Sequence, residues 1–375
     1  MKVLYNIIAI LFVFLFYSCS EQNKKILIYG NIPNLPDGTL YLYKNYYSDR
    51  IDSIKTKNGE FKLKHYFSND EEPLYLGIDH KDNNGVTRAF NFPTNTKYRG
   101  GELNTQYFMN DSLIKINGII KNFNAKDIKL SSKYILVISP RIESGKQTEA
   151  FYNIDGDLFE KIDENTIKVI SKKIAQYPYS YHLLYQIEKN KNSFTTSQID
   201  VFLKSFKGEI TQSKTYKTLL AYYEKRLINK TIVLPQLTDD KGKRLNILDS
   251  KYDKHFVIFW ASWCAPCRDE IPLLKKMYSK IDPSLEFVSV SIDSDVNKWH
   301  KALKEENMEW KQLHISEKNS PREYEDIQMY FKFNGAIPYT VLVDNNNNNN
   351  NNNKILRSFL GLTTEKELEK LILKN

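Results

Sequence analysis

The chain has 375 residues, a length that suggests two or three domains. Its composition, 41% apolar and 26% charged, is that of a globular protein, and its many tyrosines and phenylalanines (25 and 20) favour strand-rich packing. The formal charge is +9. Lysines and acidic residues are interspersed without a basic block, which indicates a solvated basic surface, argues against nucleic-acid binding and leaves attraction to anionic lipid headgroups open.

The first twenty residues, MKVLYNIIAILFVFLFYSCS, contain one lysine followed by an apolar run over residues 3–17. The run is too short for a comfortable membrane span and fits the hydrophobic part of a signal peptide. Ser18 and Cys19 follow it. A small residue before a cysteine at this place resembles the lipobox of bacterial lipoproteins, although Tyr17 stands where a smaller residue is commoner. The resemblance implies that residues 1–18 are removed and that Cys19 carries a lipid anchor.

An ordinary signal peptide with an incidental cysteine remains the alternative, and both interpretations predict export. Thiols outside the cytosol meet an oxidising environment. If Cys19 is lipidated, the exported chain keeps only Cys264 and Cys267, which can pair with each other or with another molecule.

Short runs of β-forming residues follow the signal sequence. KILIYGNI, TLYLYKNY and EFKLKHYF favour strands, and the stretches PNLPDG and KNG between them form turns. We therefore expect a small antiparallel β domain within residues 19–125. From about Glu164 the apolar spacing becomes helical, as in NTIKVISKKIAQYP, and predicts a linker and four short helices over residues 126–229. The pattern leaves open whether this segment is a spacer or an interaction surface.

Residues 230–375 show a third pattern. HFVIFW and LEFVSVSID are continuous apolar runs typical of buried central strands, and a helical stretch follows each of them. YTVLVD and KILRSFLG predict two more strands before a closing helix. This order implies an α/β sheet with an antiparallel hairpin at one edge. The nine asparagines Asn345–Asn353 fall at the tip of that hairpin, and we expect an expanded turn without function.

Cys264 and Cys267 lie in WASWCAPC, directly after the predicted strand HFVIFW and at the start of a helix. A zinc site needs four ligands, and no second cysteine pair or suitably spaced histidines accompany these two, so no metal is expected. A disulfide that closes so short a loop removes little chain entropy, which weakens a purely structural role. A helix N-terminus favours a thiolate. The pattern thus favours a redox pair, with Cys264 the exposed nucleophile and Cys267 the more buried resolving thiol.

Residues 230–375 resemble the thioredoxin-fold domain of the TlpA/ResA-like thiol–disulfide oxidoreductases. The matching motifs are FWASWCAPCRDEIP, VSVSID, GAIPYTVLVD and GLTTEKELEKLI, in that order. The resemblance implies an α/β thioredoxin fold at the C-terminus, preceded by a small antiparallel β domain and a short helical segment. Residues 25–228 resemble, more weakly, the regions that precede this domain in lipid-anchored envelope members of the family.

The family resemblance also assigns roles to residues around the cysteine pair. GAIPYT matches the cis-proline loop, so Pro338, preceded by Ile337, is expected to be cis and the loop backbone to pair with a substrate segment. A trans turn proline is the alternative. Trp260 is expected to pack in the core, and Trp263 to border the surface that binds substrate.

Glu270 stands three residues after Cys267, where members of the family carry a glutamate. Thioredoxin itself has a buried aspartate in the preceding strand, where this chain has Ile258. We expect apolar neighbours to desolvate Glu270 partly and its carboxyl to exchange a proton with Cys267. The alternative is a solvated helix residue. Pro272 resembles the helix-kinking proline of the fold.

These features predict a thiol–disulfide oxidoreductase that needs no cofactor. Cys264 attacks a substrate disulfide and Cys267 resolves the mixed disulfide. The expected partners are substrate proteins with disulfides or thiols and a membrane electron-donor thiol protein. The expected location is the bacterial cell envelope, lipid-anchored and facing the periplasm. Ala-Pro between the cysteines resembles the reducing branch of the family and favours a reductase.

Two other functions compete with this prediction. A thiol peroxidase of the peroxiredoxin type shares the fold, but that family has Thr or Ser three residues before its reactive cysteine and Pro seven before it. This chain has Ala261 and Val257 at those positions, which argues against a peroxidase. A ligand-binding envelope protein, in which the β domain captures a ligand and the redox domain is accessory, stays open.

Overall fold

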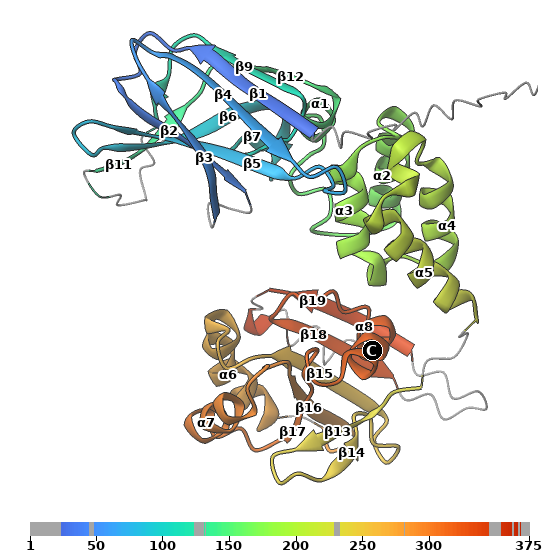
Figure 1. Ribbon diagram of the computed structural model, residues 1–375. Helices are drawn as coiled ribbons and strands as arrows, with labels where there is room; N and C mark the ends of the chain where they lie inside the picture. Colours follow the sequence, from blue (N-terminus) through green and yellow to red (C-terminus); the bar gives the residue numbers. More distant parts are fainter. Residues whose placement is uncertain are drawn as a thin grey trace, which may run out of the picture. The chain divides into compact units, whose positions relative to one another are not determined.

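The structure is a computed structural model (Figure 1). It describes residues 24–44, 49–123, 131, 133–228, 233–280, 282–344, 354–361, 364–366 and 368. The chain forms two compact units. One comprises the chain up to Glu160 together with Tyr179–His182, and the other comprises Lys161–Pro178 and the chain from Leu183 onward. The predicted signal sequence, Cys19 and the asparagine tract lie outside the described residues.

Two principal sheets build the first unit. One contains, in spatial order, β12 (Ile142–Ser144), β9 (Leu113–Asn117), β1 (Lys24–Asn31) and β4 (Glu60–Phe67). The other contains β10 (Lys121–Asn122), β11 (Tyr134–Ile138), β6 (Thr87–Tyr98), β5 (Tyr75–Asp82), β2 (Gly38–Lys44) and β3 (Asp49–Thr56). Two further strands, β7 (Gly101–Thr105) and β8 (Phe108–Met109), pair with β6 and β5.

Alternating side chains give these sheets their apolar faces. In β4, Phe61 and Leu63 are buried while the residues between and beside them are exposed. Ile28 and Leu63 from one sheet share a single hydrophobic core with Leu42 and Phe90 from the other. The two sheets therefore pack face to face as a sandwich.

The predicted antiparallel pairing is wrong for two strand pairs. β1 pairs parallel with β9, and β11 pairs parallel with β6. Turn-forming residues indicate antiparallel neighbours only where a short loop joins two strands. The strands of these two pairs are far apart in sequence, and parallel strands need a long connection between them.

The first compact unit extends past the predicted boundary at residue 125 and includes β11, β12 and α1 (Lys146–Phe151). The carboxylate of Asp111 accepts hydrogen bonds from the backbone N–H groups of Gln147 (3.0 Å) and Thr148 (2.8 Å). These N–H groups begin α1 and have no partner within the helix. A β-domain carboxylate thus anchors a helix that the periodicity of the sequence leaves undefined.

Four α-helices follow among the described residues, as predicted. They are α2 (Glu164–Gln176), α3 (Tyr181–Lys189), α4 (Thr196–Ser205) and α5 (Lys214–Ile228), with the short 3₁₀ turns η1 (Lys191–Ser193) and η2 (Gly208–Gln212) between them. Ile170 and Ile174 form a buried stripe at the expected spacing on α2, and Ile199, Phe202 and Leu203 form one on α4. Of the helices that the structure describes, none is long and apolar enough to cross a membrane.

The C-terminal sheet has the spatial order β14 (Arg244–Asn246), β13 (Gln236–Asp239), β17 (Lys311–His314), β16 (Leu285–Ser291), β15 (Lys254–Trp260), β18 (Tyr339–Asp344) and β19 (Lys354–Leu360). β15, β16 and β17 are parallel, whereas β18 and β19 form the predicted antiparallel hairpin. The last residue pair of this hairpin before the undescribed residues 345–353 is Asp344 with Lys354.

Helices cover both faces of this sheet. Val257 and Phe259 of β15 pack with Ile327 and Phe331 of α8 (Pro321–Phe331). Phe256 and Ile258 lie in a second core cluster with Leu274 of α6 (Ala265–Tyr278). A further helix, α7 (Val296–Glu306), buries Trp299 and Ala302. The continuous apolar run of β15 is explained, because both faces of the strand are buried.

Candidate functional site

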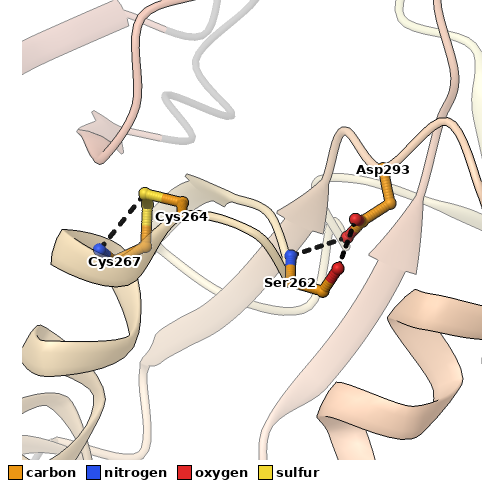
Figure 2. Close-up of a disulfide and its surroundings, with 4 residues drawn as sticks. All are labelled: Ser262, Cys264, Cys267 and Asp293. Carbon is orange, nitrogen blue, oxygen red and sulfur yellow. Dashed lines mark hydrogen bonds between the residues drawn. A yellow bond between two sulfur atoms is a disulfide. The ribbon is translucent and has the colours of Figure 1, made fainter.

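Cys264 and Cys267 lie where β15 passes into α6, and their sulfurs form a disulfide of 2.07 Å (Figure 2). Cys264 is the N-cap of the helix, and its Sγ accepts a hydrogen bond from the backbone N–H of Cys267 at 3.2 Å. Pro266 occupies the first turn, where its missing N–H costs nothing. The cysteine sulfur therefore stands in for the oxygen that usually caps a helix.

Both cysteines are buried in this disulfide form. Cys264 is 5% exposed and Cys267 is 3% exposed, so the expected exposure of Cys264 is not observed. They share an apolar cluster with Trp260, Ile271 and Trp299. The side chains of this cluster come from α7 as well as from β15 and α6. The sequence around the cysteines alone therefore could not predict that they are buried.

The two predicted tryptophan positions differ as expected. Trp260 is 2% exposed and belongs to the apolar cluster, whereas Trp263 is 64% exposed. Beside Trp263 opens a groove of about 720 Å³, whose walls include Glu317, Lys318, Asn334 and Gly335. A large exposed aromatic side chain on the wall of a polar groove is suited to contact a bound polypeptide.

The predicted cis peptide bond is present between Ile337 and Pro338. Ile337 packs against the cluster that contains both cysteines, so the loop lies beside the redox pair. The carbonyl of Pro338 accepts a hydrogen bond from the N–H of Gly361 (2.8 Å), and the hydroxyl of Tyr339 donates to the carbonyl of Phe331 (2.8 Å). The C-terminal side of the loop is therefore fixed by backbone and side-chain bonds.

Glu270 lies on α6, one turn after Cys267, and is 3% exposed. Its side chain is therefore buried more completely than the partial desolvation that the sequence predicts. Ile258, at the position of thioredoxin's aspartate, is 3% exposed in an apolar core. Glu270 is thus the buried acidic side chain on the turn of α6 that follows Cys267. Pro272 lies inside the same helix, as predicted.

Ser262 and Asp293 form a contact that sequence reasoning missed (Figure 2). The carboxylate of Asp293 accepts hydrogen bonds from the Ser262 N–H (2.9 Å), the Ser262 hydroxyl (2.6 Å) and the Ser291 hydroxyl (2.8 Å). Asp293 is 1% exposed. It follows β16 in the motif VSVSID, and the carboxyl ends of parallel strands meet at one edge of a sheet. That position is the signal from which the contact was predictable.

Two segments of the chain match models of known protein families. Residues 253–349 match the thioredoxin-like family. The C-terminal domain is thioredoxin-like. Residues 26–122 match a domain family of unknown function, DUF4369. The two matches fall in the two different compact units.

Curated relatives resemble the thioredoxin-like domain. The thiol-disulfide oxidoreductase ResA of Bacillus anthracis is 32% identical over 79 residues, which are 21% of this chain and 46% of the relative. The thioredoxin-like protein YneN of Bacillus subtilis is 36% identical over 53 residues, 14% of this chain and 31% of the relative. The chain thus spans less than half the length of these relatives. Over the matched segment it is homologous to thiol-disulfide oxidoreductases.

A solved structure gives a similar match. The thioredoxin domain of a thiol-disulfide oxidoreductase from Bacteroides vulgatus is 26% identical and is matched over 37% of this chain and 95% of its own. The TM-score of this match is 0.31.

The contact between Asp293 and the loop before Cys264 yields a testable prediction. Replacing Asp293 with alanine leaves the Ser262 N–H and the buried Ser291 hydroxyl without their acceptor. We expect the free energy of unfolding to fall by about 3 kcal/mol. The reduced protein should also react more slowly with iodoacetamide at Cys264, because a loosened loop no longer holds the sulfur at the helix N-terminus. Denaturant unfolding and alkylation rates at pH 7 measure both effects.

Asp295→Ala is the matched control, since Asp295 also accepts a backbone hydrogen bond (from Asn297, 2.9 Å) but caps α7. It should cost about 1 kcal/mol and leave the alkylation rate unchanged. Equal effects of the two substitutions on both measurements would show that Asp293 is an ordinary cap.

Proposed function

We propose that this protein is a thiol–disulfide oxidoreductase of the bacterial cell envelope that reduces disulfides in substrate proteins. The observation that carries the proposal is the Cys264–Cys267 pair at the N-terminus of α6, beside the cis Ile337–Pro338 bond of a thioredoxin-like domain. Homology of this segment to proteins named thiol-disulfide oxidoreductases supports it. No cofactor is needed, because both electrons are carried by the two sulfurs.

The proposed reaction begins from the reduced dithiol. The Cys264 thiolate attacks one sulfur of a substrate disulfide, forming a mixed disulfide and releasing the other substrate sulfur as a thiolate. The Cys267 thiolate then attacks Cys264 Sγ, which closes the Cys264–Cys267 disulfide and releases the second substrate sulfur. Two electrons pass to the substrate. A membrane electron-donor thiol protein then reduces Cys264–Cys267 again.

The N-terminus of α6 favours this order of events. The N–H group of Cys267 points at Cys264 Sγ, and a hydrogen bond to a thiolate is stronger than one to a neutral sulfur. The partial positive charge at the end of this 14-residue helix acts in the same direction. Both effects favour Cys264 as the nucleophile. Trp263 and Ile337 are proposed to contact the substrate, and the backbone beside Pro338 to pair with it.

Trapping tests the roles of the two cysteines. In Cys267→Ser the mixed disulfide cannot be resolved, so we expect disulfide-linked partners to accumulate on Cys264 in cells. Cys264→Ser lacks the attacking thiolate and should accumulate none. Non-reducing electrophoresis followed by identification of the trapped proteins measures this. Equal trapping by both variants would overturn the assignment of Cys264 as nucleophile.

Glu270 is proposed to take the proton of Cys267 as that thiol attacks the mixed disulfide. General acid–base assistance of this kind contributes about 10²–10⁴-fold to a rate. Glu270→Gln should therefore slow resolution at least about tenfold near neutral pH and leave the first attack unchanged. The deficit should shrink as the pH rises, because Cys267 then ionises unaided.

Stopped-flow fluorescence of Trp260 and Trp263 can follow both steps between pH 6 and 9. Glu323→Gln is a suitable control, since it removes a half-exposed carboxylate on α8 that pairs with Arg244. Wild-type rates for both steps in Glu270→Gln across this range would remove Glu270 from the mechanism.

The location is proposed from the N-terminal sequence, in which Cys19 follows a signal-like apolar run. A lipid on Cys19 would anchor the chain to an envelope membrane and place the redox domain in the periplasm. We expect the protein to be labelled by a radioactive fatty acid and to fractionate with membranes, and both properties to disappear in Cys19→Ala. Unlabelled wild-type protein in the soluble fraction would contradict the anchor.

A further inference from the structure

The helical segment contacts the loop that leads into the cis-proline bond. Asn192, in η1, is 4% exposed and donates from Nδ2 to the carbonyl of Phe333 at 3.0 Å. Its backbone N–H donates to Oδ1 of Asn334 at 3.2 Å, and Nδ2 of Asn334 donates to the hydroxyl of Ser193 at 2.8 Å. Three hydrogen bonds therefore join η1 to two consecutive residues of the loop.

Helix α5 holds Asn192 in the orientation that these bonds need. The hydroxyl of Tyr222 donates to Oδ1 of Asn192 at 2.6 Å, which leaves Nδ2 directed at Phe333. Burial raises the pKa of Tyr222 to about 12, so this hydroxyl keeps its proton at neutral pH. Arg226 donates to the carbonyl of Phe194 at 2.8 Å and fixes the chain just after η1. Lys225 forms an ion pair with Glu325 of α8.

Phe333 and Asn334, which η1 contacts, lie directly before the residues that lead to the cis bond at Pro338. α8 ends at Phe331 with Lys332 as its C-cap, and the ring of Phe333 stacks on Phe259 of β15 with a centroid distance of 4.5 Å. Gly335 has a positive φ of 85°, and the cis bond to Pro338 follows three residues later. The other side of the loop is held by Gly361. The stacking of Phe333 holds the N-terminal side of the loop from within the thioredoxin-like domain, and the contact with Asn192 holds the same side from outside it.

A buried polar network of this kind does more than add stability. Burying an amide costs free energy unless its hydrogen bonds are made, and apolar packing alone would join the two elements without that cost. A satisfied network instead selects one geometry of the contact. The selected geometry here is that of Asn334 and Gly335, which line the groove beside Trp263.

We propose that the helical segment positions the cis-proline loop and the adjoining groove wall for a polypeptide substrate, with Asn192 as the positioning residue. The inference rests on the proposed disulfide exchange and adds a specificity element to it. A polypeptide must pair with the loop and lie in the groove, so it depends on the position of Asn334. A small disulfide needs only access to Cys264, so its reaction does not depend on this contact.

The test compares two substrates of the reduced full-length chain. The rate constants for reduction of insulin and of hydroxyethyl disulfide are measured for wild type, Tyr222→Phe and Asn192→Ala. Tyr222→Phe removes one hydroxyl and keeps the ring, so it remains informative if Asn192→Ala does not fold. We expect the insulin rate constant to fall about threefold to tenfold in Tyr222→Phe and further in Asn192→Ala. The rate constant for hydroxyethyl disulfide should stay within about twofold of wild type.

Tyr216→Phe is the matched control. It is the same substitution on the same helix, and its hydroxyl donates to the carbonyl of Leu203 at 3.1 Å, inside the helical segment. It should lower the melting temperature about as much as Tyr222→Phe but leave both rate constants unchanged. An unchanged insulin rate in Tyr222→Phe, an equal loss with both substrates, or the same loss in Tyr216→Phe would overturn the inference. A wild-type protein that reduces neither substrate would overturn the proposed function itself.

Discussion

The hydrogen bond from the Cys267 N–H to Cys264 Sγ is the interaction on which the disulfide exchange proposed for this protein depends. The first N–H groups of a helix have no partner inside the helix, and here a sulfur atom receives one of them. In the reduced dithiol proposed as the active form, the same contact that begins α6 would stabilise negative charge on Cys264 Sγ. The buried strand β15, covered on both faces, makes this helix begin at a defined place. The contact that begins the helix is therefore also the contact that would favour Cys264 as the nucleophile.

Two buried polar side chains hold the loops around that junction. Asp293 connects the end of β16 with the residues just before Cys264, and Asn192 connects η1 with the residues just before the cis-proline bond. Each is almost fully buried, and each has hydrogen-bond partners for its side-chain polar atoms. In a medium of low dielectric constant such bonds favour one geometry strongly. Each of the two loops is thus held by a residue that lies outside it.

The helical segment is grouped differently in the structure from what its position in the sequence suggests. By sequence it stands between a β domain and a redox domain, as a spacer would. By contacts, most of it belongs to the same compact unit as the redox domain. The β sandwich, which includes the region that matches a family of unknown function, forms its own core and its own unit.

Local patterns in the sequence were sufficient to predict several features of the structure. Periodicity predicted the four helices, and the apolar runs predicted the buried strands β15 and β16. The spacing and position of Cys264 and Cys267 predicted that they pair, and the resemblance of GAIPYT predicted the cis bond at Pro338. Each of these signals lies within about one element of the chain, where neighbouring residues decide the structure.

The remaining features depend on contacts between elements that are distant in the sequence, and they became visible only in the three-dimensional structure. Four such features are the parallel pairing of β1 with β9, the extension of the first unit to Glu160, the burial of Cys264 and the contacts of Asp293. Each of them depends on contacts between residues of different elements. Asn192 and Asn334 are separated by 142 positions. A buried asparagine reads in a sequence as an ordinary polar loop residue, because its hydrogen-bond partners come from packing between elements and no local pattern specifies which elements meet.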